Sequence, residues 1–283
     1  MIRKLNQMAI NKQMNIYSIA VMDESGIQVR RLRPADACTN CYSITKFYTM
    51  TAIGMLWDQG KLRMEDKVFD LFREEFPMTY DPKWKNVTVE HLLWHTVGFD
   101  RDFVNFYLDI DVENIADYPT DDFLQIVLSN PLTHAPGEHY LYTDAAYYLL
   151  SRIVTKCSGL HLDEFLRPVL FGIMGFQEAA WSKCPRGYCM GATGLYVRTV
   201  DMVKMGYVYA NNGQYQGKNV VSAEWVQRAI DREYCMKRYE ETDLYTKGGM
   251  FGQVLAFSTD RHFACGWQGY EPRLKTRELL RGI

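Results

Sequence analysis

Ser43-Ile44-Thr45-Lys46 stands at the start of a long apolar segment that runs from Phe47 to Trp57. Residues three apart share one face of a helix, so the hydroxyl of Ser43 and the amine of Lys46 can meet. A serine is a weak nucleophile until a neighbouring base takes its proton, and a buried neutral lysine can be that base. The segment is apolar or small almost all round, which predicts a helix that runs through the core.

Ser43 also has a simpler interpretation, as the N-cap of this helix. A capping box would place Glu or Gln at position 46, where the chain has Lys. A cation in the first turn also opposes the helix macrodipole, and a local misfit of this kind points to function. We expect burial and the helix N-terminus to favour the uncharged amine of Lys46.

The composition limits the classes of partner. The chain has 283 residues, a length that suits one large domain or two intergrown ones. Its hydrophobic share of 47% is typical of a globular protein. Its 32 basic and 34 acidic residues nearly cancel, so nothing favours nucleic acid or an anionic membrane as a partner. No apolar run approaches the roughly 20 residues that span a bilayer. Leu5 to Met14 is too polar for a signal peptide, so we expect a cytoplasmic protein.

Two other patterns could carry chemistry. Cys38 and Cys41 form a Cys-x-x-Cys, which leaves a redox or zinc module open, although seven scattered cysteines are more typical of packed, reduced thiols. His91 and His95 lie at i and i+4, a spacing that can bind zinc, but Leu92 stands where a metalloprotease needs Glu. We expect packed, hydrogen-bonded histidines and no metal or other cofactor.

The order of secondary-structure signals predicts an α+β fold. Alternating segments at 15–22 and 27–32 predict a hairpin around the turn Asp23 to Gly26. Helical signals fill the middle of the chain, with starts at Thr88, at Thr120 or Asp121, and near Ala145 and Ser222. Segments at 252–257 and 262–267 alternate again as strands. Strands from both ends can share one antiparallel sheet, and the helical middle can form its own lobe.

Four segments carry a family pattern, in this order: Ser43 to Lys46 with Gln59-Gly60-Lys61-Leu62, Val87 to Gly98, Pro136-Gly137-Glu138 with Tyr142-Thr143-Asp144, and Gly194 to Met202. Together they resemble the serine beta-lactamase and penicillin-binding-protein superfamily over roughly residues 15 to 270, most closely the class C beta-lactamase-related hydrolases and esterases. The resemblance implies a beta-lactamase/transpeptidase-like fold, with a sheet lobe at 1–62 and 180–283, a helical lobe at 63–179, and one catalytic cleft between the lobes.

The same resemblance implies roles for single residues. Ser43 would be the nucleophile, Lys46 its activating partner, and Tyr142 a second proton-transfer group for the leaving group. An oxyanion hole would use the N–H of Ser43 and one from a late strand. Asp144 stands where the family usually has Asn, and an ionised Asp only accepts hydrogen bonds. A carboxylate near Lys46 would favour the protonated amine and weaken it as a base.

The family's third motif, usually Lys-Thr-Gly or His-x-Gly on the strand beside the nucleophile, is less clear. The best candidate is Trp267-Gln268-Gly269, which with Asp144 would bind substrate, but it has no cation for a substrate carboxylate. The family normally continues with further strands and a long C-terminal helix, whereas this chain stops at Ile283. The C-terminal strands and helix are therefore expected to be truncated. A bared sheet edge favours a homodimer that covers it.

The sequence thus predicts a serine hydrolase that forms an acyl-enzyme with an ester, amide or beta-lactam carbonyl of a small molecule. The unclear third motif favours an esterase or peptidase-like activity over efficient beta-lactam hydrolysis. The alternative is a catalytically impaired ligand-binding protein on the same scaffold.

Overall fold

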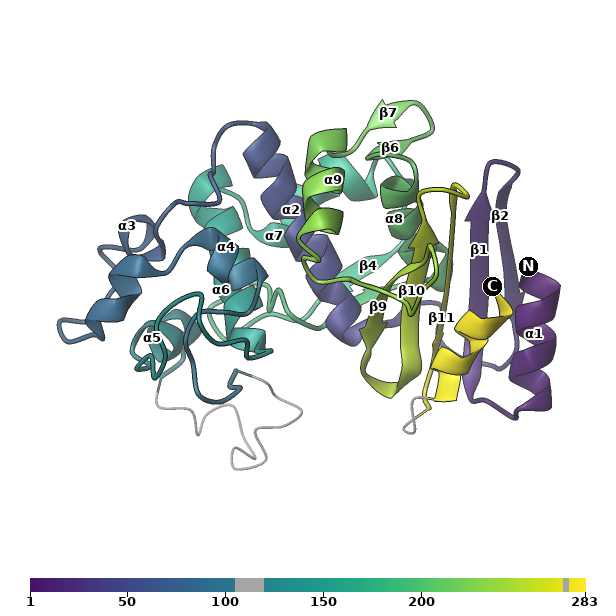
Figure 1. Ribbon diagram of the computed structural model, residues 1–283, viewed down its shortest axis with the longest axis horizontal. Helices are drawn as coiled ribbons and strands as arrows, with labels where there is room; N and C mark the ends of the chain where they lie inside the picture. Colours follow the sequence, from purple (N-terminus) through teal and green to yellow (C-terminus); the bar gives the residue numbers. More distant parts are fainter. Residues whose placement is uncertain (105–119, 272–274) are drawn as a thin grey trace. The chain divides into compact units, whose positions relative to one another are not determined.

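The computed structural model describes residues 1–104, 120–271 and 275–283 (Figure 1). The chain forms two compact units, of which the first comprises residues 1–48, 167–180 and 193–283 and the second residues 49–166 and 181–192. The division falls after Tyr48, inside helix α2 (Thr45–Asp58). We predicted boundaries after residues 62 and 179 instead, and the cleft between the two parts stays a prediction.

The first unit holds almost all of the strands. Its elements are α1 (Ile2–Asn11), β1 (Ile16–Asp23), β2 (Gly26–Arg31), β3 (Thr39–Asn40), η1 (Tyr42–Ile44), η4 (Arg167–Phe171), β4 (Ala179–Trp181), β5 (Leu195–Val197), α8 (Thr199–Ala210), β6 (Gln214–Tyr215), β7 (Lys218–Asn219), α9 (Ala223–Asp231), β8 (Lys237–Arg238), β9 (Tyr245–Gly249), η5 (Met250–Gly252), β10 (Gln253–Ser258), β11 (Phe263–Gly269) and η6 (Lys275–Gly282). The last residue of β4 belongs to the second unit.

The main sheet joins the two ends of the chain. Its strand order is β2-β1-β11-β10-β9-β8, and each neighbouring pair is antiparallel. The prediction of an α+β fold, with an antiparallel sheet built from N- and C-terminal strands, is confirmed. A short second sheet has the order β3-β5-β4, and its strand β3 directly precedes the turn η1 that carries Ser43. The described sheet ends at β2 and β8, and a homodimer that covers a sheet edge stays a prediction.

Helices cover both faces of this sheet. Helix α8 packs on β11, β1 and β10, while α1 and η6 pack against each other and against β1 and β10 (Figure 1). A Cβ at Gly206 would lie 2.8 Å from Leu255 Cδ1, so glycine lets α8 approach β10 closely. On the other face, apolar side chains of α1, the strands and η6 form one buried cluster, which includes Leu5, Ile19, Val254, Trp267 and Leu279. The charged C-terminal stretch thus contributes to the core as η6.

The second unit is helical. Beyond the main part of α2, it contains α3 (Val68–Leu71), η2 (Pro82–Asn86), α4 (Val89–Leu93), α5 (Phe123–Leu128), α6 (Asp144–Ser158) and α7 (Leu162–Leu166). Thr88 caps α4 in a capping box, as its position predicted, whereas Asp122 caps α5 in place of the expected Thr120 or Asp121. Helix α6 begins after the N-cap Thr143 and ends at Gly159, whose φ of 77° suits a glycine C-cap.

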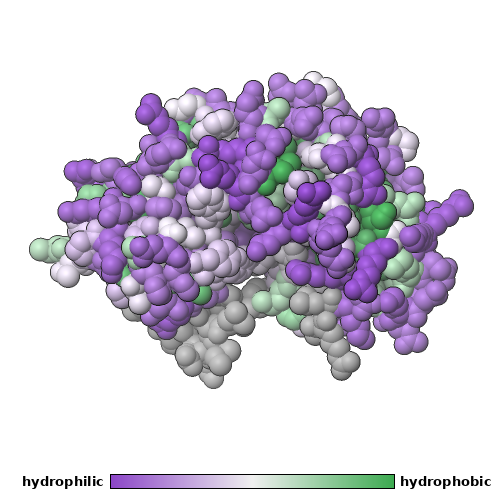
Figure 2. All heavy atoms as spheres, viewed as in Figure 1, coloured by the Kyte–Doolittle hydropathy of each residue, from purple (hydrophilic) through white to green (hydrophobic). Residues whose placement is uncertain are grey.

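The surface shown in Figure 2 is mostly hydrophilic, and hydrophobic residues appear there in small separate patches. Among the described residues, no helix has the length and apolar character to cross a membrane. The cytoplasmic location stays a prediction.

Candidate active site

Ser43 and Lys46 meet at the start of α2. The Nζ atom of Lys46 lies 3.5 Å from the Oγ atom of Ser43, at the outer limit of a hydrogen bond. Lys46 is fully buried, whereas Ser43 is half-buried and so accessible. The helix was expected to begin at Ser43, but this residue lies in the short 3-10 turn η1 and α2 begins at Thr45. A buried amine beside an accessible hydroxyl is the arrangement that general-base activation of a serine requires.

The turn that carries Ser43 is held by its flanking strands. Tyr42 has a left-handed backbone with φ of 48°, which is costly for a bulky residue and needs support from its surroundings. Asn40 provides it, because its Oδ1 accepts a hydrogen bond of 2.8 Å from the Tyr42 N–H. On the β5 side, Cys41 N–H donates to the Leu195 carbonyl, and Leu195 N–H donates to Thr45 Oγ1. The strand that precedes η1 and the helix that follows it are therefore both tied to β5.

Strand β9 lies next to this turn. Both β9 and β10 pack against η1. A Cβ at Gly249 would lie 2.4 Å from the Cys41 carbonyl oxygen, so only glycine allows this approach. Lys247 is two residues earlier on the same strand and therefore on the same face, and it is 9% exposed. The sequence analysis assigned no role to this segment; the signal that it missed is a basic residue followed by two glycines just before a strand pair.

The three residues predicted for the third motif lie elsewhere. Trp267, Gln268 and Gly269 end β11, which in the sheet is separated from β9 by β10. All three are buried, Trp267 in the apolar cluster beneath α1 and Gln268 on the opposite face, where its carboxamide bonds to Thr199. The expectation that they lie on the strand beside the nucleophile is wrong, because β11 is a central strand of the sheet. Their role in substrate binding stays a prediction that this position does not favour.

In the second unit, His95 holds the segment that contains Tyr142. The His95 carbonyl accepts from Leu141 N–H at 2.8 Å, and its Nδ1 atom accepts from Thr143 N–H at 3.2 Å. The imidazole lies against the Tyr142 ring, with centroids 4.5 Å apart. His95 also has a positive φ of 57°, so a strained backbone stands beside Tyr142 in this unit as one does beside Ser43 in the other. These contacts fix Tyr142, and the sequence analysis, which treated His95 only as a packed residue, did not identify that role.

Asp144 follows as the first residue of α6. It is buried at 5% exposure, and its backbone N–H donates to Asp102 Oδ1 at 2.9 Å. An acidic residue in the first turn is favoured by the helix dipole, which gives Asp144 a structural reason beside any catalytic one. Ser43 and Lys46 belong to the first unit, and Tyr142 and Asp144 belong to the second.

The two alternative motifs find ordinary structural partners. His91 Nδ1 accepts from Thr88 N–H in the capping box of α4. All seven cysteines lie within the described residues and are thiols. Burial, followed by the hydrogen bond to Glu178 and its charge, raises the pKa of Cys38 to about 11, and burial raises the pKa of Cys41 as well. A raised pKa is the opposite of what a redox-active Cys-x-x-Cys requires.

Comparison with known proteins gives a consistent result. The family model named Beta-lactamase matches residues 17–270. Penicillin-binding protein 4* of Bacillus subtilis is 30% identical over 169 residues, which are 59% of this chain and 34% of the relative. The chain spans 34% to 46% of the length of the first curated relatives that it matches.

Two solved structures show the same fold at low sequence identity. A penicillin-binding protein from Bacillus halodurans superposes with a TM-score of 0.75 at 18% identity, and the match covers 98% of each chain. A family VIII carboxylesterase gives a TM-score of 0.74 at 14% identity, covering 100% of this chain and 96% of the other.

Proposed function

The chain belongs to the beta-lactamase family, and from that premise we propose that it is a serine hydrolase whose nucleophile is Ser43. The observation that carries the proposal is the distance of 3.5 Å between Lys46 Nζ and Ser43 Oγ, with the amine buried and the hydroxyl accessible. Burial disfavours the charged form of a lysine, so the site suits an amine that accepts the serine proton.

In the proposed first step, Lys46 takes the hydroxyl proton while Ser43 Oγ forms a bond to the substrate carbonyl carbon. The negative charge that develops on the carbonyl oxygen needs fixed donors. The backbone N–H of Ser43 is one, and an N–H at the end of β9 is the other, because Gly249 brings this strand against the residues that precede Ser43. Each donor of this kind is worth about 2.7–4 kcal/mol in known hydrolases.

The proposed second proton donor is Tyr142, which gives a proton to the leaving group as the carbonyl–leaving-group bond breaks. This role is supported by the fixed position of Tyr142, whose ring lies against the His95 imidazole and whose neighbour Thr143 donates to His95 Nδ1 just before α6. Water then attacks the acyl-enzyme and gives a proton to Tyr142, while Lys46 returns its proton to Ser43 Oγ as the acid is released. This mechanism needs the two units to face each other across a cleft, as the sequence analysis expected. It uses no metal or organic cofactor.

Lys247 widens the class of substrate that we propose. The sequence analysis doubted recognition of a substrate carboxylate because its third-motif candidate has no cation. Lys247 lies on the strand that packs against η1, on the face that Gly249 presents to Cys41. We propose that this ammonium attracts a carboxylate of the substrate, which keeps peptide-like amides and beta-lactams beside simple esters as candidates.

Intact-mass spectrometry tests the nucleophile directly. The protein is incubated with a fluorophosphonate, a penicillin and an activated ester, and Ser43→Ala serves as the control. We expect a covalent mass increase with at least one probe in the wild type and none in the variant. No adduct with any probe, or an adduct that persists in Ser43→Ala, would contradict the proposed mechanism.

One observation favours a second candidate, a ligand-binding protein with little turnover. Asp144 replaces the family's usual Asn by a group that only accepts hydrogen bonds and favours a protonated Lys46. Thermal stabilisation by a beta-lactam, without an adduct and without hydrolysis, would identify this alternative.

A further inference from the structure

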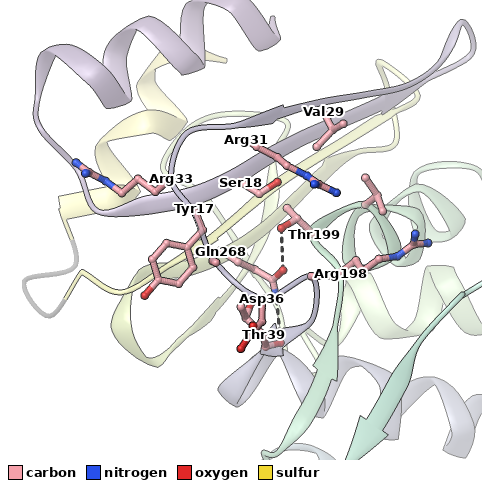
Figure 3. A pocket seen from close by; sticks show the side chains of 13 residues that line it. Tyr17, Ser18, Val29, Arg31, Arg33, Asp36, Thr39, Arg198, Thr199 and Gln268 are labelled. Carbon is pink, nitrogen blue, oxygen red and sulfur yellow. Dashed lines mark hydrogen bonds between the residues drawn. The ribbon is translucent and has the colours of Figure 1, made fainter.

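A pocket of about 330 Å³ lies in the first unit between β2, the segment 33–39 and the start of α8 (Figure 3). This volume is at the lower end of the range for sites of small organic ligands. Its lining residues are Tyr17, Ser18, Val29, Arg31, Arg33, Ala35, Asp36, Ala37, Thr39, Arg198, Thr199, Val200 and Gln268. None of them is part of the proposed catalytic machinery.

The floor of the pocket is rigid because Gln268 is fully engaged below it. This side chain is 1% exposed, its Oε1 accepts from the Thr199 hydroxyl at 2.8 Å, and its Nε2 donates to the carbonyls of Thr39 and Val197 at 3.2 and 3.3 Å. A buried carboxamide with both ends bonded does not swing into the space above it. This side of the pocket is therefore preformed.

One cation of the pocket is available to a ligand. In the described part of the chain, the exposed guanidinium of Arg31 has no hydrogen bond or ion pair. Arg198 differs, because Asp201 holds it through two contacts of 2.6 and 3.0 Å. Figure 3 shows Arg31 extending above Thr199, while Arg33 extends away from that side.

A hydroxyl accompanies this cation. Ser18 on β1 pairs directly with Arg31 on β2, so the two side chains are cross-strand neighbours on one face of the sheet. Val29, two residues before Arg31, shares that face and adds an apolar wall. Asp36 is the acidic member of the lining set, and it disfavours a ligand with more than one negative charge.

We propose that this pocket binds a small organic monocarboxylate. The carboxylate accepts paired hydrogen bonds from the Arg31 guanidinium, whose fork matches its two oxygens, and a further one from the Ser18 hydroxyl. The organic part of the ligand lies against Val29, Val200 and the alanines of the segment 33–39. The site is independent of acylation at Ser43.

The test uses benzoate as the probe and observes the side-chain amide of Gln268 by NMR in low-chloride buffer. We expect a saturable shift of this signal with benzoate and a much weaker one with benzyl alcohol or benzylammonium, which have similar shapes but other charges. Inorganic phosphate, which is largely doubly charged, should bind more weakly than benzoate.

Two matched variants locate the binding. Arg31→Gln should weaken benzoate about tenfold or more, as expected for loss of a charged hydrogen-bond donor. Arg30→Gln removes the same charge from the preceding residue of β2, whose side chain lies on the other face of the sheet. It should change the affinity for benzoate less than twofold. Equal losses in both variants, no shift at Gln268, or stronger binding of benzylammonium would overturn the proposal. None of these measurements depends on catalysis, so they remain decisive if the proposed hydrolase activity fails.

Discussion

Gln268 Nε2 donates a hydrogen bond of 3.2 Å to the Thr39 carbonyl, and this bond ties the central strand β11 to the strand that leads into Ser43. The same nitrogen lies 3.3 Å from the Val197 carbonyl on β5 and 3.5 Å from Cys41 Sγ. One buried carboxamide therefore links β11, β3 and β5. A residue that the sequence suggested as a substrate contact thus fixes the backbone behind the turn that carries Ser43.

Replacing Gln268 by Met should destabilise the protein strongly. The substitution keeps the volume but removes three buried hydrogen bonds of the carboxamide, to the Thr199 hydroxyl and to the Thr39 and Val197 carbonyls, at a cost of roughly 2–4 kcal/mol in the free energy of unfolding. Urea unfolding measures this cost. Within the described residues, the exposed side chain of Gln227 bonds only to Asp231 on α9, so Gln227→Met should change stability by less than about 0.5 kcal/mol. Equal effects of the two substitutions would show that the link is unimportant.

Cys38 should react slowly with alkylating reagents. Burial, and then the hydrogen bond and charge of Glu178, raise its pKa to about 11, so little thiolate exists at pH 8. With iodoacetamide at that pH we expect a rate roughly 100-fold below that of an unperturbed cysteine. Glu178→Gln removes the charge and should increase the rate several-fold. Rapid labelling of Cys38 in the wild type, detected by peptide mass spectrometry, would restore the redox interpretation.

The turn between β10 and β11 should contribute a pH-dependent part of the stability. Arg261 Nε lies 2.6 Å from Asp243 Oδ2, and this guanidinium, together with the Ser258 hydroxyl, holds the pKa of Asp243 below its usual range. A carboxyl with a lowered pKa in the folded state stabilises it above the unfolded value of about 3.9, and the contribution is lost as the pH falls through the folded value.

Asp243→Asn should therefore cost about 0.5–1 kcal/mol at pH 7, and the difference from the wild type should shrink toward pH 3. Urea unfolding at several pH values measures the loss of stability at pH 7 and its decrease toward pH 3. Asp260→Asn, an exposed substitution in the same turn, serves as the control. A difference between Asp243→Asn and wild type that stays constant from pH 7 to pH 3 would rule out the ion pair as its cause.

The sequence predicted the elements whose signals are local. The hairpin at the N-terminus, the cap at Thr88 and the contact between Ser43 and Lys46 depend on spacings of a few residues, and the structure has all of them. The strand β9 was missed because Tyr245 to Gly249 has no alternation of apolar and polar residues. Gly249, a residue type that usually weakens a strand, is needed there because the Cys41 carbonyl leaves no space for a side chain.

The error about the third motif had a different origin. Trp267-Gln268-Gly269 was chosen from its position late in the chain, but strand order in a sheet is a tertiary property that no local pattern encodes. The sheet inserts β11 between β1 and β10, and so leaves β9 to pack against η1. The left-handed backbones of Tyr42 and His95 were equally invisible, since a positive φ is rare for Tyr and, although more frequent for His, is still adopted by few histidines.

Under the proposed function, Asp144 should affect the protonation state of the Lys46 amine. If its carboxylate favours the protonated form of Lys46, Asp144→Asn should increase the acylation rate near neutral pH and move the acid limb of the rate profile to lower pH. A stopped-flow measurement with an activated ester gives both quantities. The control Asp260→Asn has the same change of net charge on an exposed turn and should leave the profile in place. A slower reaction with an unchanged acid limb would contradict this prediction, because it would show that the charge of Asp144 does not act on Lys46.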